Sequence, residues 1–233
     1  VWVSSVRQSI SGAQLNPLYR LDARGRLDPT FNAVFPRSLW LSVDGFFLQP
    51  DGRVICSIIR SKAADMPQSY GLVELDATGK PGRLSLPDLA DNKVNAVAIQ
   101  PDGKLLIAGD FKKINGSERY NVARLNRDGT LDHTFVPPML EGTTYWGGIH
   151  LHDDGRVLLS GTTIIKGQYF NLMRLMPNGT IDPTLAFEKG SGSLAYDFIY
   201  LPDGKILLAG QFRSFNGKAT SQIMRLMYDA AGK

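Results

Sequence analysis

Two histidines separated by one residue form the clearest metal-ligating pattern in the sequence. His150 and His152 stand in an apolar run and are followed by Asp153 and Asp154. Alternate residues of a strand point to one face, so two imidazoles and a carboxylate could together hold zinc. A zinc site usually needs three or four converging ligands, and the aspartates fall where a hairpin turn is expected. The pattern therefore favours a polar strand end beside a turn, and we predict no metal and no cofactor.

An oxygen-rich segment matches part of a calcium-binding loop. Asn126, Asp128 and Asp132 are arranged around Gly129, and calcium loops space their oxygen ligands around a glycine in this way. The segment lacks the first aspartate and the final bidentate glutamate of such a loop. A hairpin turn capped by an Asn or Asp side chain explains the same residues.

Catalytic groups are harder to recognise. The single cysteine, Cys56, lies in an apolar run without a nearby histidine, which is typical of a small buried hydrophobe rather than a nucleophile.

Glycoside hydrolysis would need two carboxyl groups about 5 to 10 Å apart across a cleft. The carboxylates that we considered for such a pair are Asp44, Asp110, Glu118 and Asp197. Three tryptophans are candidates for either a sugar platform or core packing: Trp2, Trp40 and Trp146.

Basic residues in two variable loops are the candidates for binding a partner, because binding usually resides in loops on a rigid scaffold. They are Lys112, Lys113, Arg119, Arg213 and Lys218. If these loops emerge on one side, the sequence predicts a basic loop face for a protein or glycan partner. The alternative is a set of solvated charges with no partner.

The composition excludes several other classes of protein. The 233 residues are 43% hydrophobic and 21% charged, which is ordinary for a folded globular protein. The 26 basic and 22 acidic residues are interspersed, so a nucleic-acid-binding stripe is not expected. No stretch approaches the roughly 18 apolar residues of a membrane span.

These residues are set in a repeat of about 50 residues. An Asp-Gly pair precedes an apolar run at Gly52, Gly103, Gly155 and Gly204, and a second anchor, Arg-Leu or Glu-Leu, follows each. Two apolar runs joined by Asp-Gly predict a β-hairpin. A third run and a short fourth segment complete each repeat.

The repeat predicts an all-β fold, a β-propeller of about five blades, which could also be a fragment of a larger or open propeller. A β-sandwich is the competing fold. We expect one propeller domain over residues 1–233, with flanking repeats or self-association covering any open edge. The predicted repeats, numbered one to five below, are 1–31 (partial), 32–86, 87–135, 136–185 and 186–233 (partial).

Residues 97–111 and 123–132, with Asn115-Gly116 between them, resemble the bacterial delta-60 repeat. Repeat five matches through residues 210–212 and 216–217, whereas repeats two and four depart from the pattern. The resemblance implies a propeller in an exported, extracellular or cell-surface bacterial protein, and it implies no catalytic residues. We therefore expect a non-enzymatic interaction or adhesion scaffold. The alternative is a carbohydrate-active propeller, either lectin-like or hydrolytic.

An arginine and an aspartate also recur eight residues apart. The pairs are Arg20 with Asp28, Arg124 with Asp132 and Arg174 with Asp182. Repeat two lacks both members, as expected if they act together. We predict a structural ion pair across the turn after the third strand, against the alternative of independent drift.

Overall fold

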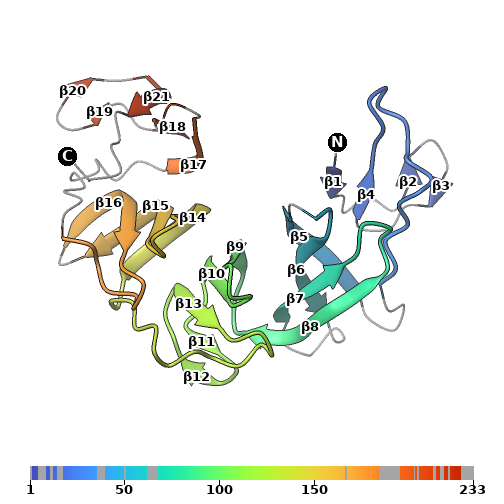
Figure 1. Ribbon diagram of the computed structural model, residues 1–233, viewed down its shortest axis with the longest axis horizontal. Helices are drawn as coiled ribbons and strands as arrows, with labels where there is room; N and C mark the ends of the chain where they lie inside the picture. Colours follow the sequence, from blue (N-terminus) through green and yellow to red (C-terminus); the bar gives the residue numbers. More distant parts are fainter. Residues whose placement is uncertain are drawn as a thin grey trace. The chain divides into compact units, whose positions relative to one another are not determined.

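The structure is a computed structural model (Figure 1), and all of its regular structure in the described residues is β-strand. No helix in this part of the chain could span a membrane. The described residues are 2–4, 9–10, 13–14, 18–35, 40–49, 51–61, 68–165, 167–183, 195–201, 203, 205–211, 214–215, 218–219 and 221–226. The all-β prediction is confirmed.

The chain divides into two compact units, and the first comprises residues 1–94 and 113–117. It begins with two antiparallel pairs, which are β1 (Trp2–Ser4) with β4 (Leu18–Arg20) and β2 (Ser9–Ile10) with β3 (Ala13–Gln14). Its large sheet has the order β12-β11-β8-β7-β6-β5. The bounds are β5 (Trp40–Leu48), β6 (Val54–Ser61), β7 (Ser69–Leu75), β8 (Pro81–Ala90), β11 (Lys113–Ile114) and β12 (Ser117–Glu118).

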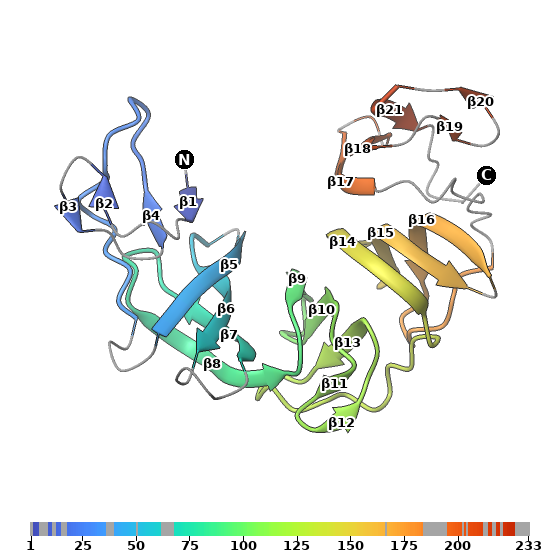
Figure 2. The ribbon, with the colours of Figure 1, turned by 180° about the vertical axis from the view of Figure 1, so that it is seen from behind.

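The second unit comprises residues 95–112 and 118–233. Its sheets have the orders β13-β10-β9, β14-β15-β16 and β17-β18-β21, with a β19-β20 pair (Figure 2). The first sheet contains β9 (Val94–Ile99), β10 (Leu105–Gly109) and β13 (Val122–Leu125). The others contain β14 (Glu141–Leu151), β15 (Val157–Ile165), β16 (Gln168–Leu175), β17 (Ala195–Tyr200), β18 (Ile206–Gly210), β19 (Ser214–Phe215), β20 (Lys218–Ala219) and β21 (Ile223–Leu226).

The predicted Asp-Gly turns join the first and second strands of the repeats. Gly52, Gly103 and Gly155 have φ values of 84°, 81° and 81°, while the preceding aspartates keep negative φ. These turns are therefore the longer hairpin form, in which only the glycine adopts the left-handed conformation. Gly204 lies outside the described residues.

The apolar runs form the core, as predicted. The matched residues Val54, Leu105, Val157, Ile206, Ile107, Leu159 and Leu208 are all buried. Successive sheets pack through these faces within a unit. Leu18 of β4 packs with Val43 and Val54 of the next sheet, and Leu172 of β16 packs in the same way with Phe198 and Ile206.

The fourth strand is the most variable part of the repeat. Among the residues that the structure describes, it is reduced to one bridge in repeats one, three and four, such as Leu125 with Leu131. In repeat two it is the ten-residue strand β8, which pairs with β7. The predicted irregularity of repeat two is therefore a longer fourth strand.

Candidate functional site

The recurring arginine and aspartate form ion pairs in all three repeats that carry them. The Nε–Oδ2 distances are 2.8 Å for Arg20 with Asp28, 2.8 Å for Arg124 with Asp132 and 2.7 Å for Arg174 with Asp182. The turn after the third strand brings the partners together, because the aspartate N–H donates to the arginine carbonyl oxygen. The predicted pairing is confirmed.

A second cation from the Asp-Gly hairpin joins this ion pair. Lys104 Nζ lies 2.8 Å from Asp132 Oδ2, and an Arg156 guanidinium nitrogen lies 3.3 Å from Asp182 Oδ2. Burial alone would raise the pKa of Asp132. Hydrogen bonds from Lys104, Thr134 and Arg124 outweigh that effect and hold its pKa well below the usual range.

The arginine also connects consecutive sheets. Arg124 donates to the carbonyl oxygen of Pro177 at 2.8 Å, and Arg20 donates to that of Ala77 at 3.2 Å. Both acceptors lie in the turn after the third strand of a following sheet. We call the recurring pair of arginine and aspartate, together with the second cation or the carbonyl oxygen where these are present, the ion lock, and its geometry is structural because the charges are paired.

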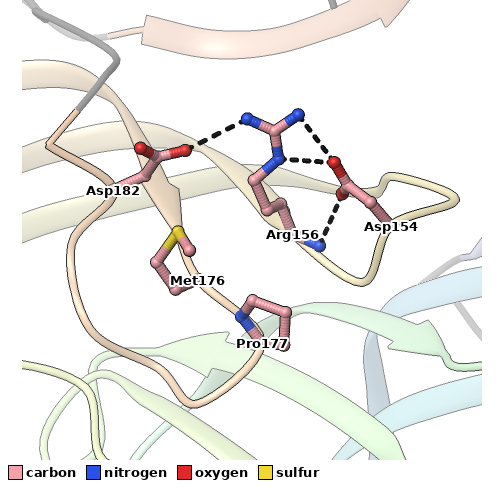
Figure 3. A pocket seen from close by; sticks show the side chains of 5 residues that line it. All are labelled: Asp154, Arg156, Met176, Pro177 and Asp182. Atoms are coloured by element: carbon pink, nitrogen blue, oxygen red, sulfur yellow. Dashed lines mark hydrogen bonds and ion pairs between the residues drawn. The ribbon is translucent and has the colours of Figure 1, made fainter. Parts of the chain in front are cut away.

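In repeat four the ion lock borders a pocket of about 300 Å³ (Figure 3). Its lining residues are Asp154, Arg156, Met176, Pro177 and Asp182. Arg156 lies between the two carboxylates, with its Nε 2.6 Å from Asp154 Oδ2. Asp182 is buried, whereas the side chain of Asp154 is 50% exposed and that of Arg156 is 19% exposed. The groups that a ligand can reach are therefore Asp154 and Arg156, beside Met176 and Pro177.

The turn beside this pocket differs between repeats three and four. Arg127 holds the place of Pro177 there, and it donates from Nε to the carbonyl oxygen of Asp102. Its side chain lies so close over Gly103 that a Cβ on that glycine would be 2.6 Å from Nε. In repeat four, a Cβ added to Gly155 would lie 3.4 Å from its nearest neighbour, the Cγ atom of Pro177. The long side chain of repeat three is therefore replaced in repeat four by a short proline ring beside the hairpin glycine.

The electrostatics of the pocket favour recognition over proton transfer. Hydrogen bonds from the Arg156 side chain and backbone lower the pKa of Asp154, so this carboxylate is ionised at neutral pH. Asp182 forms ion pairs with the guanidinium groups of Arg174 and Arg156. The pocket offers hydrogen-bond acceptors and donors at fixed positions above an apolar surface.

The two histidines lie together without assembling a metal centre. Their ring centroids are 5.3 Å apart in an edge-on contact, and His150 also contacts Phe198. Burial lowers the pKa of both imidazoles, which keeps them neutral at pH 7. The described residues contain no group of three or more side chains suited to hold a metal ion.

The calcium-like segment is a capped turn. Asp128 accepts hydrogen bonds from the N–H and hydroxyl of Thr130, while Asp132 belongs to the ion lock. Cys56 is fully buried, and burial raises its pKa to about 12. Trp146 is buried as well and offers no sugar platform. The side chains of Trp2 and Trp40 lie outside the described residues.

The four carboxylates considered for hydrolysis have different surroundings. Asp44 pairs with Lys93 at 2.9 Å, and Asp197 accepts the backbone N–H of Phe198 at 2.8 Å. Glu118 is exposed in β12, and Asp110 is half-buried after β10. Among the described residues, none of these four carboxylates lines the repeat-four pocket.

The basic loop candidates are only partly brought together. Lys112 and Arg119 are linked by a hydrogen bond from the Arg119 N–H to the Lys112 carbonyl oxygen. Lys113 is exposed, and its N–H donates to Asp91 in the first unit. Arg213 and the side chain of Lys218 lie outside the described residues. The basic loop face therefore stays a prediction.

Sequence reasoning did not find Arg156, Met176 and Pro177. The available signal was a departure from the repeat, since Pro177 aligns with Arg127 and with Ala77. A proline at a position held by arginine removes a long side chain from the turn. Whether a hollow results depends on what that side chain covers, which only the structure shows.

Comparison with known families supports the interpretation of the repeat. The chain has a β-propeller fold. Residues 100–135, 152–185 and 201–229 match the family described as "Domain of unknown function (DUF5122) beta-propeller". These segments lie in repeats three, four and five. The match supports a β-propeller repeat family, as the resemblance implied, but it does not confirm the name delta-60 for the repeat. No curated protein matches the chain.

Solved structures share the fold at low identity. A protein from Lactobacillus plantarum is 18% identical over 94% of this chain and 61% of its own, with a TM-score of 0.51. A gluconolactonase from Xanthomonas campestris is 15% identical over 83% of this chain and 62% of its own, with a TM-score of 0.48. The chain therefore spans about three fifths of the length of these structures.

The expectation of a non-enzymatic protein is corrected by these structures. Besides the gluconolactonase, they include an endo-arabinase from Bacteroides thetaiotaomicron, 15% identical over 81% of this chain and 75% of its own, with a TM-score of 0.41. One fold can host many functions, so the absence of a sequence motif for catalysis was no ground for excluding an enzyme.

Proposed function

We propose that the chain binds carbohydrate in the repeat-four pocket. The observation that carries this proposal is one hollow that combines an exposed carboxylate and a guanidinium with an apolar surface. Its volume of about 300 Å³ is at the lower end of the range for small-molecule sites. A single sugar ring is a ligand of suitable size.

The chemistry of a sugar ring complements these side chains. Its hydroxyl groups both donate and accept hydrogen bonds, and its C–H groups form apolar faces. Asp154 can accept from two neighbouring hydroxyl groups, and Arg156 can donate to their oxygens. Met176 and Pro177 can contact a C–H face. Because Arg156 is already held by Asp154 and Asp182 (Figure 3), little side-chain entropy is lost on binding.

Binding is favoured over hydrolysis at this pocket. A glycoside hydrolase needs one carboxyl group that stays protonated to act as general acid. The pKa of Asp154 is lowered by Arg156, and Asp182 lies against two guanidinium groups. Asp154 is therefore present as the carboxylate, which suits hydrogen bonding to a ligand, and the Asp182 carboxyl group is occupied by its ion pairs.

A glycan array with the full chain tests the proposal, followed by titration calorimetry with the best ligand. Asp154→Asn should weaken binding about tenfold or more, because a hydrogen bond to a charged group contributes about 1.5 to 3 kcal/mol. The matched control is Asp102→Asn, which changes the equivalent aspartate of repeat three and should leave the affinity unchanged. Equal losses in both variants, or no glycan bound, would contradict the proposal.

A screen with chromogenic glycosides separates binding from turnover. We expect no hydrolysis that depends on Asp154, for the reasons given above. Turnover that Asp154→Asn abolishes would show instead that this pocket is a hydrolytic site.

The wider setting belongs to the same proposal. The delta-60-like residues at 97–111 and 123–132 support a repeat of an exported bacterial surface protein. In that setting, glycan binding would serve adhesion or recognition, and the basic loops with Lys112 and Arg119 would contribute a second contact. Detection of the native protein in surface fractions of its bacterium would test the location.

A further inference from the structure

The most exposed charged group in the repeat-four pocket is a carboxylate. The side chain of Asp154 is 50% exposed and that of Arg156 is 19% exposed, whereas Asp182 and Arg174 are buried. These four groups form one row of ion pairs with alternating charge, from Arg174 at the buried end to Asp154 at the open end, and Figure 3 shows the outer three. A ligand in the pocket therefore meets Asp154 as its most accessible charge.

The guanidinium group of Arg156 is already held by carboxylates on two sides. Its Nε and one terminal nitrogen each lie 2.6 Å from Asp154 Oδ2, and the other terminal nitrogen lies 3.3 Å from Asp182 Oδ2. An acidic ligand would have to share this cation with both carboxylates and would lie beside two like charges, which is unfavourable. The pocket therefore disfavours an acidic sugar.

Asp154 is held in place to accept a further hydrogen bond. Its Oδ1 accepts the Arg156 N–H at 3.0 Å, while its Oδ2 accepts from the guanidinium group. A carboxylate has about four acceptor positions, so the exposed side of Asp154 can take another donor. A protonated amine is a stronger donor for this carboxylate than a hydroxyl group, because both partners of the hydrogen bond are then charged.

The charges around the pocket differ from those of repeat three. The stretches compared are residues 153–156 with 174–182 and residues 101–104 with 124–132. In repeat four they contain three aspartates and two arginines, whereas in repeat three they contain three aspartates and three cations. The missing cation is the counterpart of Arg127, whose place Pro177 takes, and Asp153 is exposed beside Asp154. Repeat four thus has an excess of negative charge that repeat three lacks.

The geometry points to an amino sugar with a free, protonated amino group as the ligand class of this pocket, an inference that rests on the glycan-binding function proposed above. The ammonium group donates to Asp154, and a neighbouring hydroxyl oxygen accepts from Arg156. A C–H face of the ring contacts Met176 and Pro177. A neutral sugar makes the same ring contacts, so one charged hydrogen bond separates the two classes of sugar.

Titration calorimetry of the full chain tests the inference at about pH 6, where an aliphatic amine is protonated and an aspartate is ionised. The probes are glucosamine, glucose and glucuronic acid, with the corresponding derivatives of galactose. In at least one series the amino sugar should bind about threefold tighter than the neutral sugar or better, and the acidic sugar should bind most weakly.

The outcomes separate this inference from the proposal on which it rests. Equal affinities for amino and neutral sugars, or tightest binding of the acidic sugar, would overturn the inference and leave glycan binding standing. Failure of all these sugars to bind would contradict both.

Asp154→Asn identifies the group that binds the amine. The substitution keeps the size of the side chain and one acceptor oxygen but removes the charge, so the ratio of amino-sugar to neutral-sugar affinity should fall to about one. High salt should reduce the ratio of the wild type, since exposed charges are screened. The matched control is Asp102→Asn in repeat three, which should keep the ratio of the wild type. A preference for the amino sugar that persists in Asp154→Asn would overturn the assignment.

Discussion

Repeats three and four have the same ion lock but present different surfaces. Asp132 and Asp182 each pair with a third-strand arginine and with a cation from the Asp-Gly hairpin. In repeat three Arg127 lies over the hairpin glycine, whereas the equivalent neighbour in repeat four is the ring of Pro177. The same repeated framework therefore presents a different side chain beside the hairpin in each repeat.

The ion locks themselves differ in burial, and this difference should have the largest effect on stability. Arg174 is fully buried beside Asp182, whereas Arg20 and Asp28 are partly exposed. Asp182→Ala removes the carboxylate that pairs with the buried guanidinium of Arg174. It should therefore lower the free energy of unfolding by about 3 to 5 kcal/mol. Asp28→Ala should cost much less. Urea denaturation measures both, and equal losses would show that burial does not set the strength of the lock.

The next largest contrast concerns the third-strand residue that lies two positions before the arginine or glutamate of the second anchor. This residue is buried in repeats one to four, whereas its equivalent in repeat five, Ile223, is exposed. Leu172→Ala removes methyl groups from a packed interface and should cost about 2 to 5 kcal/mol. Ile223→Ala changes an exposed side chain and should stay within about 0.5 kcal/mol in dilute solution. Similar losses at both positions would mean that Ile223 is covered within its own chain.

A smaller, pH-dependent effect is expected at Asp28. Hydrogen bonds from the hydroxyl and N–H of Thr30, with the Arg20 contact, lower its pKa from 3.8 to about 2. A pKa that is lower in the folded state stabilises the fold above pH 3.8, and this stabilisation disappears as the pH falls towards 2. The stability difference between the wild type and Asp28→Asn should shrink over that interval. A stability difference that stays constant over this pH interval would show that the ionisation of Asp28 does not contribute to it.

Much of the fold follows from spacing in the sequence. The Asp-Gly pairs at Gly52, Gly103 and Gly155 predict hairpins because glycine adopts positive φ without strain. The apolar runs predict strands buried on both faces, since each sheet packs between neighbours. The pairing of Arg124 with Asp132 was also predictable, because their joint recurrence points to one interaction.

The pocket was not predictable in the same way. Its lining residues come from the Asp-Gly hairpin and from the segment after the third strand, and the directions of their side chains do not follow from the sequence spacing. The histidines show the opposite case. His150 and His152 do lie together, but a metal centre would need a third ligand from another element, and the sequence spacing of two residues contains no information about it.

The most direct test of the account is the affinity of the Pro177→Arg variant for the glycan selected on the array. Copying the residue of repeat three into repeat four should cover Gly155 as Arg127 covers Gly103, while the backbone carbonyl that Arg124 uses is kept. We predict that calorimetry shows binding lost by about tenfold or more, with the folding stability unchanged. An affinity equal to that of the wild type would contradict the claim that this pocket is the glycan-binding site.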